Sequence, residues 1–293
     1  MKKIATLLLA AAVMLAALFT LVSCNSNTNN AGNNSPSPAP SEASPAPSQA
    51  APAPVGKIVC GITEYEPMNY RDGSGNWTGF DTEFALLVGE KLNMEVEFQM
   101  IEWGNKFAEL NSGAISCIWN GFTANAEEDG VPRDTLCDMS YIYMLNQQCV
   151  VVKTDRVGEF TSIESLVGKE VAVESGSAGE SAAQDLVGAS GKTIGASTQI
   201  NTFLEVKSGA VDCAIVDILL AQKIAGSGDY ADLTIASIEL DAEVYAIGFK
   251  TGDPLRNAVN QAMRELDESG TLAALAEKYG LENNYVLDTS YGS

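Results

Sequence analysis

The sequence predicts an α/β fold built from two similar lobes, on three observations. Short β-branched runs alternate with helical patterns across residues 55–293, which is typical of βα units around a mainly parallel sheet. The segment 108–121 (AELNSGAISCIWNG) aligns without gaps on 204–217 (LEVKSGAVDCAIVD), and the same order of strands and helices precedes both copies. Chance could produce this number of identities, but residues 55–293 also exceed the usual size of one domain.

The first 23 residues read as an export signal. Lys2 and Lys3 precede an apolar run that ends in Leu21-Val-Ser-Cys24. The run is long enough to remain as a transmembrane anchor. The quartet, however, resembles the lipobox of bacterial lipoproteins, in which the cysteine receives diacylglycerol. We therefore expect residues 1–23 to be a cleaved signal peptide and Cys24 to carry the lipid.

Residues 24–54 are expected to form a disordered tether behind the lipidated cysteine. Beyond Cys24 they contain almost only Asn, Ser, Pro, Ala and Thr, with Glu42 as the one charge. Such a segment buries too little apolar surface to offset the entropy of ordering. Its prolines favour an extended form that holds the folded part away from the membrane.

Composition excludes several function classes. The net charge of −21 argues against a nucleic-acid partner or an anionic membrane surface. The absence of histidine removes Ser-His and Cys-His nucleophiles and the commonest zinc ligand. We expect no metal or other cofactor, because the cysteines lack metal-knuckle spacing and no phosphate loop is present. The cysteines of the folded part, expected to be mostly buried free thiols, are Cys60, Cys117, Cys137, Cys149 and Cys213.

Strands and helices alternate along the folded part. Strands are expected to begin at Lys57, Met94, Ala114, Gln148, Lys169, Thr193, Val211 and Val244. A helix is expected to start at Asp81 as its N-cap, a second at Asp253-Pro254 and a third at Thr271, each with one apolar face. Ligands of open α/β sheets lie beyond the carboxyl ends of parallel strands. Asn120-Gly121 and Asp217, which end the two aligned copies, should therefore face each other across a cleft.

From Val55 to about Leu281 the chain resembles the family-3 solute-binding proteins of amino-acid ABC transporters. No single motif is diagnostic, but their order and spacing are. The motifs are Glu66-Pro-Met-Asn-Tyr70, Asp72-Gly-Ser-Gly-Asn76, Thr78-Gly-Phe-Asp81, Asn120-Gly-Phe-Thr123, Asp138-Met-Ser140 with Tyr141, Gly176-Ser-Ala-Gly179, Val216-Asp217 and Asp267-Glu-Ser-Gly-Thr271.

The resemblance implies a type II periplasmic-binding-protein fold. Lobe 1 would comprise residues 55–146 plus 243–293, and lobe 2 residues 147–242, with hinge segments near 143–148 and 239–245. Hinge closure would capture a polar amino acid, which a membrane permease would then receive. The protein would be a monomer outside the cytoplasmic membrane, attached only through its lipid, and would not be an enzyme.

A zwitterionic ligand needs a cation for its carboxylate and an anion for its ammonium group. Arg133 stands five residues before Asp138, where the family places its carboxylate-binding arginine. Extra residues around 126–132 separate it from Thr123, so Arg133 could instead pair with a surface acid. Asp217 matches the family's ammonium-binding aspartate, but it could also be a helix N-cap.

The remaining site residues follow from family positions and from the ends of strands. Ser177 and the amides of Ala178 and Gly179 start a helix and offer an anion site, or form a plain glycine-rich turn. Trp103 occupies an aromatic position that could equally be core. The other candidate lining residues are Thr123, the main chain at Asn120 and Gly121, and Tyr65 or Glu66, which would cover the ligand side chain.

Two other function classes stay open. Dehydratases acting on cyclic amino-acid precursors share this fold, and they need an acid near the leaving hydroxyl. Glu66 and Glu174 are the candidate acids. A ligand-sensing domain for a membrane receptor is the other alternative.

Overall fold

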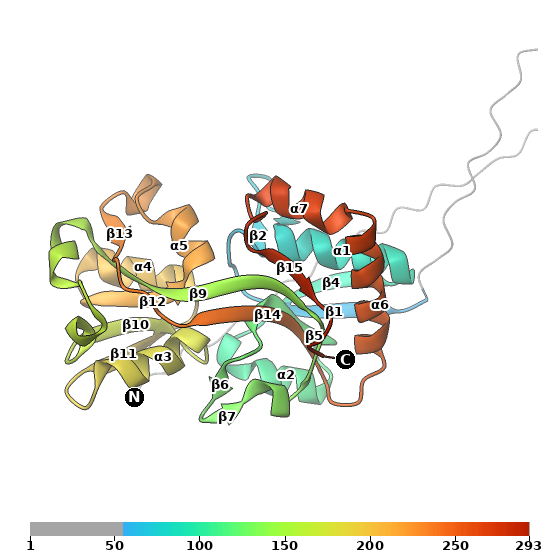
Figure 1. Cartoon of the computed structure of the whole chain (residues 1–293), viewed down its shortest axis with the longest axis horizontal. Helices are drawn as coiled ribbons and strands as arrows, with labels where there is room; N and C mark the ends of the chain where they lie inside the picture. The colour runs from blue at the N-terminus through green and yellow to red at the C-terminus, as the bar shows by residue number, and fades with distance from the viewer. Residues whose placement is uncertain (1–54, 293) are drawn as a thin grey trace, which may run out of the picture. The chain divides into compact units, whose positions relative to one another are not determined.

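The computed structural model describes residues 55–292 (Figure 1). The predicted signal peptide, the lipidation site Cys24 and the tether lie outside the described residues. Within residues 55–292, no helix is both long enough and apolar enough to cross a bilayer.

Lobe 1 is a sheet covered by helices on both faces. Strand β1 lies between β4 and β5 and is parallel to both. Helix α1 packs against α6 and α7. The bounds are β1 (Lys57–Ile62), β4 (Glu95–Met100), β5 (Cys117–Thr123), α1 (Phe80–Leu92), η1 (Trp103–Asn105), α2 (Lys106–Ser112), α6 (Leu255–Glu268) and α7 (Thr271–Tyr279).

Lobe 2 repeats this plan with a smaller sheet. Strand β10 lies between β11 and β12 and is parallel to both. Helices α3 and α4 pack on β10, and α5 packs on β9 and β12. The bounds are β10 (Glu170–Glu174), β11 (Lys192–Ala196), β12 (Cys213–Asp217), α3 (Ala178–Val187), α4 (Gln199–Ser208) and α5 (Ile218–Ile224). The predicted two-lobed α/β fold is confirmed.

Two long strands join the lobes: β9 (Ile142–Lys153) and β14 (Ala242–Phe249). They pair antiparallel with each other, with Gln147 opposite Ala242 and Met144 opposite Tyr245. In lobe 1, β14 pairs with β5, and in lobe 2, β9 pairs with β12 (Figure 1). The strand expected at Gln148 therefore begins six residues earlier and contains the first hinge segment. The lobe boundaries at 146/147 and 242/243 stay a prediction, because both strands continue across them.

Short elements complete the described chain. They are β2 (Tyr70–Arg71), β3 (Trp77–Thr78), β6 (Glu127–Glu128), β7 (Val131–Pro132), β8 (Asp138–Met139), β13 (Leu233–Ile235), β15 (Tyr285–Asp288), η2 (Arg133–Thr135), η3 (Thr154–Glu159), η4 (Ile163–Leu166) and η5 (Gly228–Tyr230). Strands β6 and β7 pair as a hairpin that contains the extra residues before Arg133.

The expected element starts hold with small shifts and one correction. Helix α7 begins at Thr271 as predicted. Helix α6 begins at Leu255, and the Leu255 amide donates to Asp253 Oδ1. Asp81 does not cap α1: the cap position is Gly79, and Asp81 is fully buried. Its Oδ2 accepts from the Gly121 amide (2.7 Å) and from the Tyr143 hydroxyl (3.0 Å). Burial raises the pKa of this carboxyl to about 7.

The five cysteines of the described chain are buried and free, as the sequence indicated for most of them. Cys60 and Cys117 are register partners on β1 and β5, with sulfur atoms 3.8 Å apart.

Candidate functional site

A small cavity of about 10 Å³ lies between the lobes. Lobe 1 contributes the end of β5, η1 and Arg133, whereas lobe 2 contributes the starts of α3 and α4 and the end of β12. Eight predicted site residues line it: Trp103, Asn120, Gly121, Thr123, Arg133, Ser177, Ala178 and Asp217. The remaining volume is about that of one water molecule, so a ligand requires rearrangement of the lining.

Arg133 is buried at this cavity, with 1% of its side chain exposed, and it also pairs with an acid, the partly exposed Glu128 of the inserted hairpin. Its Nε and Nη2 donate to Glu128 Oε2 at 3.3 and 3.1 Å, and Nη1 donates to Thr123 O at 3.2 Å. Nη2 also donates to Gly176 O of lobe 2 at 3.0 Å. Burial lowers the pKa of the guanidinium, and the Glu128 carboxylate opposes this shift.

Lys106 is a second buried cation beside Arg133. Its ammonium donates to Glu128 Oε1 (2.6 Å), Gly176 O (2.8 Å) and Trp103 O (3.4 Å). An ammonium has three donors, so all of them are used. Burial and the nearby positive charge of Arg133 lower its pKa to about 8.

The two lobes come close at their backbones here. Gly176 has φ +75°, and a Cβ at this position would lie 2.6 Å from Gly104 Cα. Only glycine allows this approach, which brings Gly176 O within reach of both Arg133 and Lys106.

Asp217 stands at the N-cap position of α5, but its side chain makes no cap hydrogen bond. Its carboxylate instead accepts from the amides of Asn146 (2.5 Å), Gln148 (2.9 Å) and Gln199. It is 6% exposed, and burial raises its pKa. The N-cap alternative is therefore wrong for the side chain: Asp217 is a buried carboxylate held by neutral donors.

Two further carboxyl groups lie near Asp217. Glu243 Oε2 accepts from Asn146, Gln148 and Thr123 at 2.8, 3.1 and 3.3 Å. Glu174 lines the cavity, and its Oε1 has no hydrogen-bond partner within residues 55–292. Burial and the Asp217 charge raise the pKa of Glu243 to about 7 and that of Glu174 to about 8. The acids therefore outnumber the bases around the cavity.

The β5 residues support the site mainly through internal hydrogen bonds. Asn120 Oδ1 accepts from the amide and the hydroxyl of Thr63, and Asn120 Nδ2 donates to Thr63 O. Asn120 borders the cavity, but its side-chain amide is therefore already hydrogen-bonded within lobe 1. The Gly121 amide is already bonded to Asp81. The φ of Gly121 is +54°, and a Cβ here would lie 2.6 Å from the Tyr65 ring, which explains the need for glycine.

At the start of α3, Ser177 is a helix cap. Its Oγ accepts from the Glu180 amide at 3.0 Å. Trp103 is 5% exposed and its ring lies 6.1 Å from that of Phe122, so it belongs to the core while also lining the cavity.

Two predicted residues do not line the small cavity. Tyr65 is 2% exposed, and its hydroxyl is 2.6 Å from that of Tyr245. Glu66 is exposed and borders none of the cavities described here. In this state, therefore, neither Tyr65 nor Glu66 is placed to contact a ligand in the small cavity.

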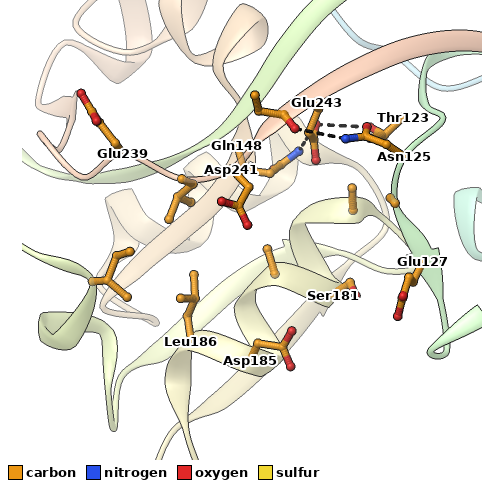
Figure 2. A pocket seen from close by; sticks show the side chains of 16 residues that line it. Thr123, Asn125, Glu127, Gln148, Ser181, Asp185, Leu186, Glu239, Asp241 and Glu243 are labelled. Atoms are coloured by element: carbon orange, nitrogen blue, oxygen red, sulfur yellow. Dashed lines mark hydrogen bonds between the residues drawn. The ribbon is translucent and has the colours of Figure 1, made fainter. Parts of the chain in front are cut away.

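A larger cleft of about 350 Å³ adjoins the small cavity and shares Thr123, Gln148 and Ala178 with it. Figure 2 shows Glu243 at its edge, bonded to Thr123 and Gln148. Five acids and no base line this cleft; the acids are Glu127, Asp185, Glu239, Asp241 and Glu243. Aliphatic side chains, including Ile163, Leu186 and Leu240, form part of its wall.

Sequence reasoning missed several residues of the site, namely Lys106, Glu128, Asn146, Gln148, Gln199 and Glu243. Asn146 and Gln148 lie on one face of β9, within a run of three polar residues that interrupts a mostly apolar strand, and this interruption was an available signal. Glu174 ends an apolar strand just as Asp217 does, although it was considered only as a catalytic acid. For Lys106 and Glu128 no local signal exists, because only the folding of the hairpin brings them together.

Comparison of the sequence with known protein families identifies the family of this chain. Residues 58–282 match the bacterial extracellular solute-binding proteins, family 3. The chain belongs to this family. The arginine-binding extracellular protein ArtP of Bacillus subtilis (strain 168) is 27% identical over 226 residues, which cover 76% of this chain and 86% of ArtP.

Two solved structures extend the likeness of this solute-binding protein. An ancestral arginine-binding protein bound to arginine is 28% identical with a TM-score of 0.70, covering 76% of this chain and 97% of that one. The ancestral amino acid-binding protein AncCDT-1, a precursor of cyclohexadienyl dehydratase, is 27% identical with a TM-score of 0.68. The match covers 76% of this chain and 95% of that chain.

Proposed function

We propose that this protein binds an amino acid between its lobes and delivers it to the permease of an ABC importer. The observation that carries the proposal is the meeting of buried opposite charges from two lobes at one cavity. Arg133 comes from lobe 1 and Asp217 from lobe 2. These groups suit the carboxylate and the ammonium of a zwitterion. Hinge bending in β9 and β14 would open the cavity to the ligand.

The charge balance supports a ligand with a cationic side chain. Asp217, Glu174 and Glu243 face only neutral hydrogen-bond donors or none, and the adjoining cleft is acidic. A buried acid is stabilised in its charged form by a cation. The arginine ligands of ArtP and of the ancestral protein agree with this class. We infer arginine, lysine or ornithine rather than glutamine as the preferred ligand.

The proposal includes attachment at the outer face of the membrane through lipid on Cys24, and a monomeric state. The support for the lipid attachment is the Leu-Val-Ser-Cys quartet and the polar stretch that follows it. Metabolic labelling with a fatty-acid probe should mark the wild-type chain and not Cys24→Ala. Labelling of both chains would contradict the anchor.

A thermal-shift screen of the mature protein against the twenty amino acids and cystine tests the binding role. Ligand at about 100 times its Kd adds about 2.7 kcal/mol of stability. For a chain of this size that raises Tm by roughly 5–10 °C. Arg133→Ala and Asp217→Ala should lose the shift.

Matched controls for this screen are Arg71→Ala and Asp229→Ala, which remove exposed charges away from the cavity. Both should keep the wild-type shift. If no amino acid raises Tm, the amino-acid proposal is wrong.

A dehydratase remains a second candidate because of one observation. Glu174 is buried at the cavity, and its raised pKa of about 8 keeps the carboxyl protonated at neutral pH, as a general acid requires. AncCDT-1 connects the same fold to a dehydratase lineage. Incubation with a hydroxylated cyclohexadiene precursor should reveal aromatic product if the protein has this activity, and Glu174→Gln should abolish it.

A further inference from the structure

The two cations of lobe 1 already hold a carboxylate that belongs to the protein. Glu128 Oε1 is 2.6 Å from the Lys106 ammonium, and Oε2 is 3.1 Å from Arg133 Nη2. An amino-acid ligand would present a carboxylate of the same shape and charge to the same donors. Four of their other five N–H groups donate to main-chain oxygens of Thr123, Trp103 and Gly176.

No space is left for a second carboxylate beside these cations. Arg133 is 1% exposed, and the cavity that it borders holds about 10 Å³. The Lys106 side chain is fully buried and does not reach that cavity. A ligand carboxylate can reach Arg133 only if a group that now contacts it moves away.

Glu128 is the group best able to move. It lies on the β6–β7 hairpin, whose four strand residues form one isolated two-stranded sheet. Its turn residues Asp129 and Gly130 are exposed, with φ of 50° and 77°. Two-stranded hairpins are only marginally stable alone. A space of about 120 Å³ lies between the hairpin and the start of α3, bordered by Glu128 and Ser177.

We propose that Glu128 stands in for the ligand's carboxylate at a two-cation anchor formed by Arg133 and Lys106, and that the ligand must displace it. Lys106 thereby becomes a ligand-binding residue, and Glu128 becomes a determinant of affinity. The inference rests on the proposed binding function, because it names how that same site admits a carboxylate.

Displacement by a ligand has a quantitative consequence. When the binding-competent state is only fractionally populated, the apparent Kd rises by the inverse of that fraction. If Glu128 holds the anchor about nine-tenths of the time, its removal raises apparent affinity about tenfold. A residue that merely positioned Arg133 would have the opposite effect, because its loss would weaken binding.

The first arm of the test uses acetate, a carboxylate without an ammonium group. Glu128→Ala leaves a vacancy between Lys106 and Arg133 that acetate fits. Acetate at tens of millimolar should raise the Tm of Glu128→Ala more than that of wild type, at ionic strength held constant with chloride. Asp129→Asn is the matched control, since it removes one charge from the same hairpin at a positive φ that asparagine accepts. Equal acetate shifts in all three proteins would overturn the proposal.

The second arm measures amino-acid affinity by calorimetry in wild type, Glu128→Gln and Asp129→Asn. A rise of about tenfold in Glu128→Gln alone is expected. Unchanged or weaker binding in Glu128→Gln would overturn the proposal. If no amino acid binds any of the three proteins, the proposed function fails, while the acetate arm still decides whether Glu128 fills an anion anchor.

Discussion

In lobe 1, Arg133 and Lys106 share an ion pair with the protein's own Glu128, whereas Asp217 and Glu243 beside the hinge strands accept only from amides and a hydroxyl. Both sides are buried to a similar degree. A buried charge without an opposite partner is costly, and the raised pKa values of the acids express this cost. We call Arg133 and Lys106, which bind an anion, the anion anchor, and Asp217 and Glu243, which would bind a cation, the cation anchor. The difference indicates that the anion anchor is occupied in this state and the cation anchor is not.

The strongest test of this difference removes the charge of the cation anchor. Asp217→Asn should weaken ligand binding by at least about 100-fold, because the ligand ammonium loses its buried partner. Calorimetry measures this loss, and Asp229→Asn on the surface is its control. A loss below tenfold would show that Asp217 is a structural residue of the α5 start.

A second variant breaks the contact that joins the anion anchor to lobe 2. In Gly176→Ala the new methyl meets Gly104 Cα, which separates Gly176 O from both cations. We expect about tenfold weaker binding and a larger radius of gyration by small-angle X-ray scattering.

The control is Gly113→Ala, which has a similar φ of +79° but open space around its Cβ. It carries the same backbone strain without the clash between lobes. Equal effects of the two variants would mean that strain, and not separation of the lobes, causes the loss.

The third prediction concerns pH. Glu174, Glu243 and Asp81 have folded pKa values raised to about 8, about 7 and about 7. A raised pKa contributes stability that is complete below the unfolded value and lost as pH rises through the folded one. The lowered pKa of Lys106 acts mainly above pH 8. The Tm of the ligand-free protein should therefore fall by at least about 5 °C between pH 5.5 and pH 8.

Glu174→Gln should flatten this dependence, whereas Glu282→Gln, which removes an exposed acid, should not. A Tm that rises from pH 5.5 to pH 8 would contradict the conclusion that the buried acids lack a partner of opposite charge. Differential scanning calorimetry gives both curves.

The smallest expected effect concerns the acidic rim of the adjoining cleft. Asp241→Asn and Glu239→Gln remove exposed charges, which contribute little each. Together they should weaken arginine binding about two- to threefold and leave glutamine binding unchanged. Equal losses of affinity for both ligands would mean that this cleft does not recognise the ligand's side chain.

The sequence predicted the features that have a local signal. The alternation of elements, the start of α7 and the end of β12 at Asp217 follow from periodicity, capping and strand-end rules. The role of Asp81 was misread because a buried carboxylate and an N-cap look alike in a sequence. Only its contacts with Gly121 and Tyr143 distinguish them.

The insertion before Arg133 shows where sequence reasoning stops. The extra residues were visible as a break in spacing, which favoured doubt about Arg133. The structure keeps Arg133 at the cavity and makes the insertion part of the site, because the hairpin returns Glu128 to Arg133 and Lys106. A contact of this kind depends on the path of the folded chain, and no pattern of residue types encodes it.

The paired strands β9 and β14 carry a consequence for signalling to a partner. Asn146 and Glu243 are opposite one another in this ladder, and both take part in the hydrogen bonds around Asp217. Under the proposed function, the part of the chain that bends would therefore also be the part that senses ligand charge. Occupancy would change the stiffness of the joint directly, without a relay through either lobe.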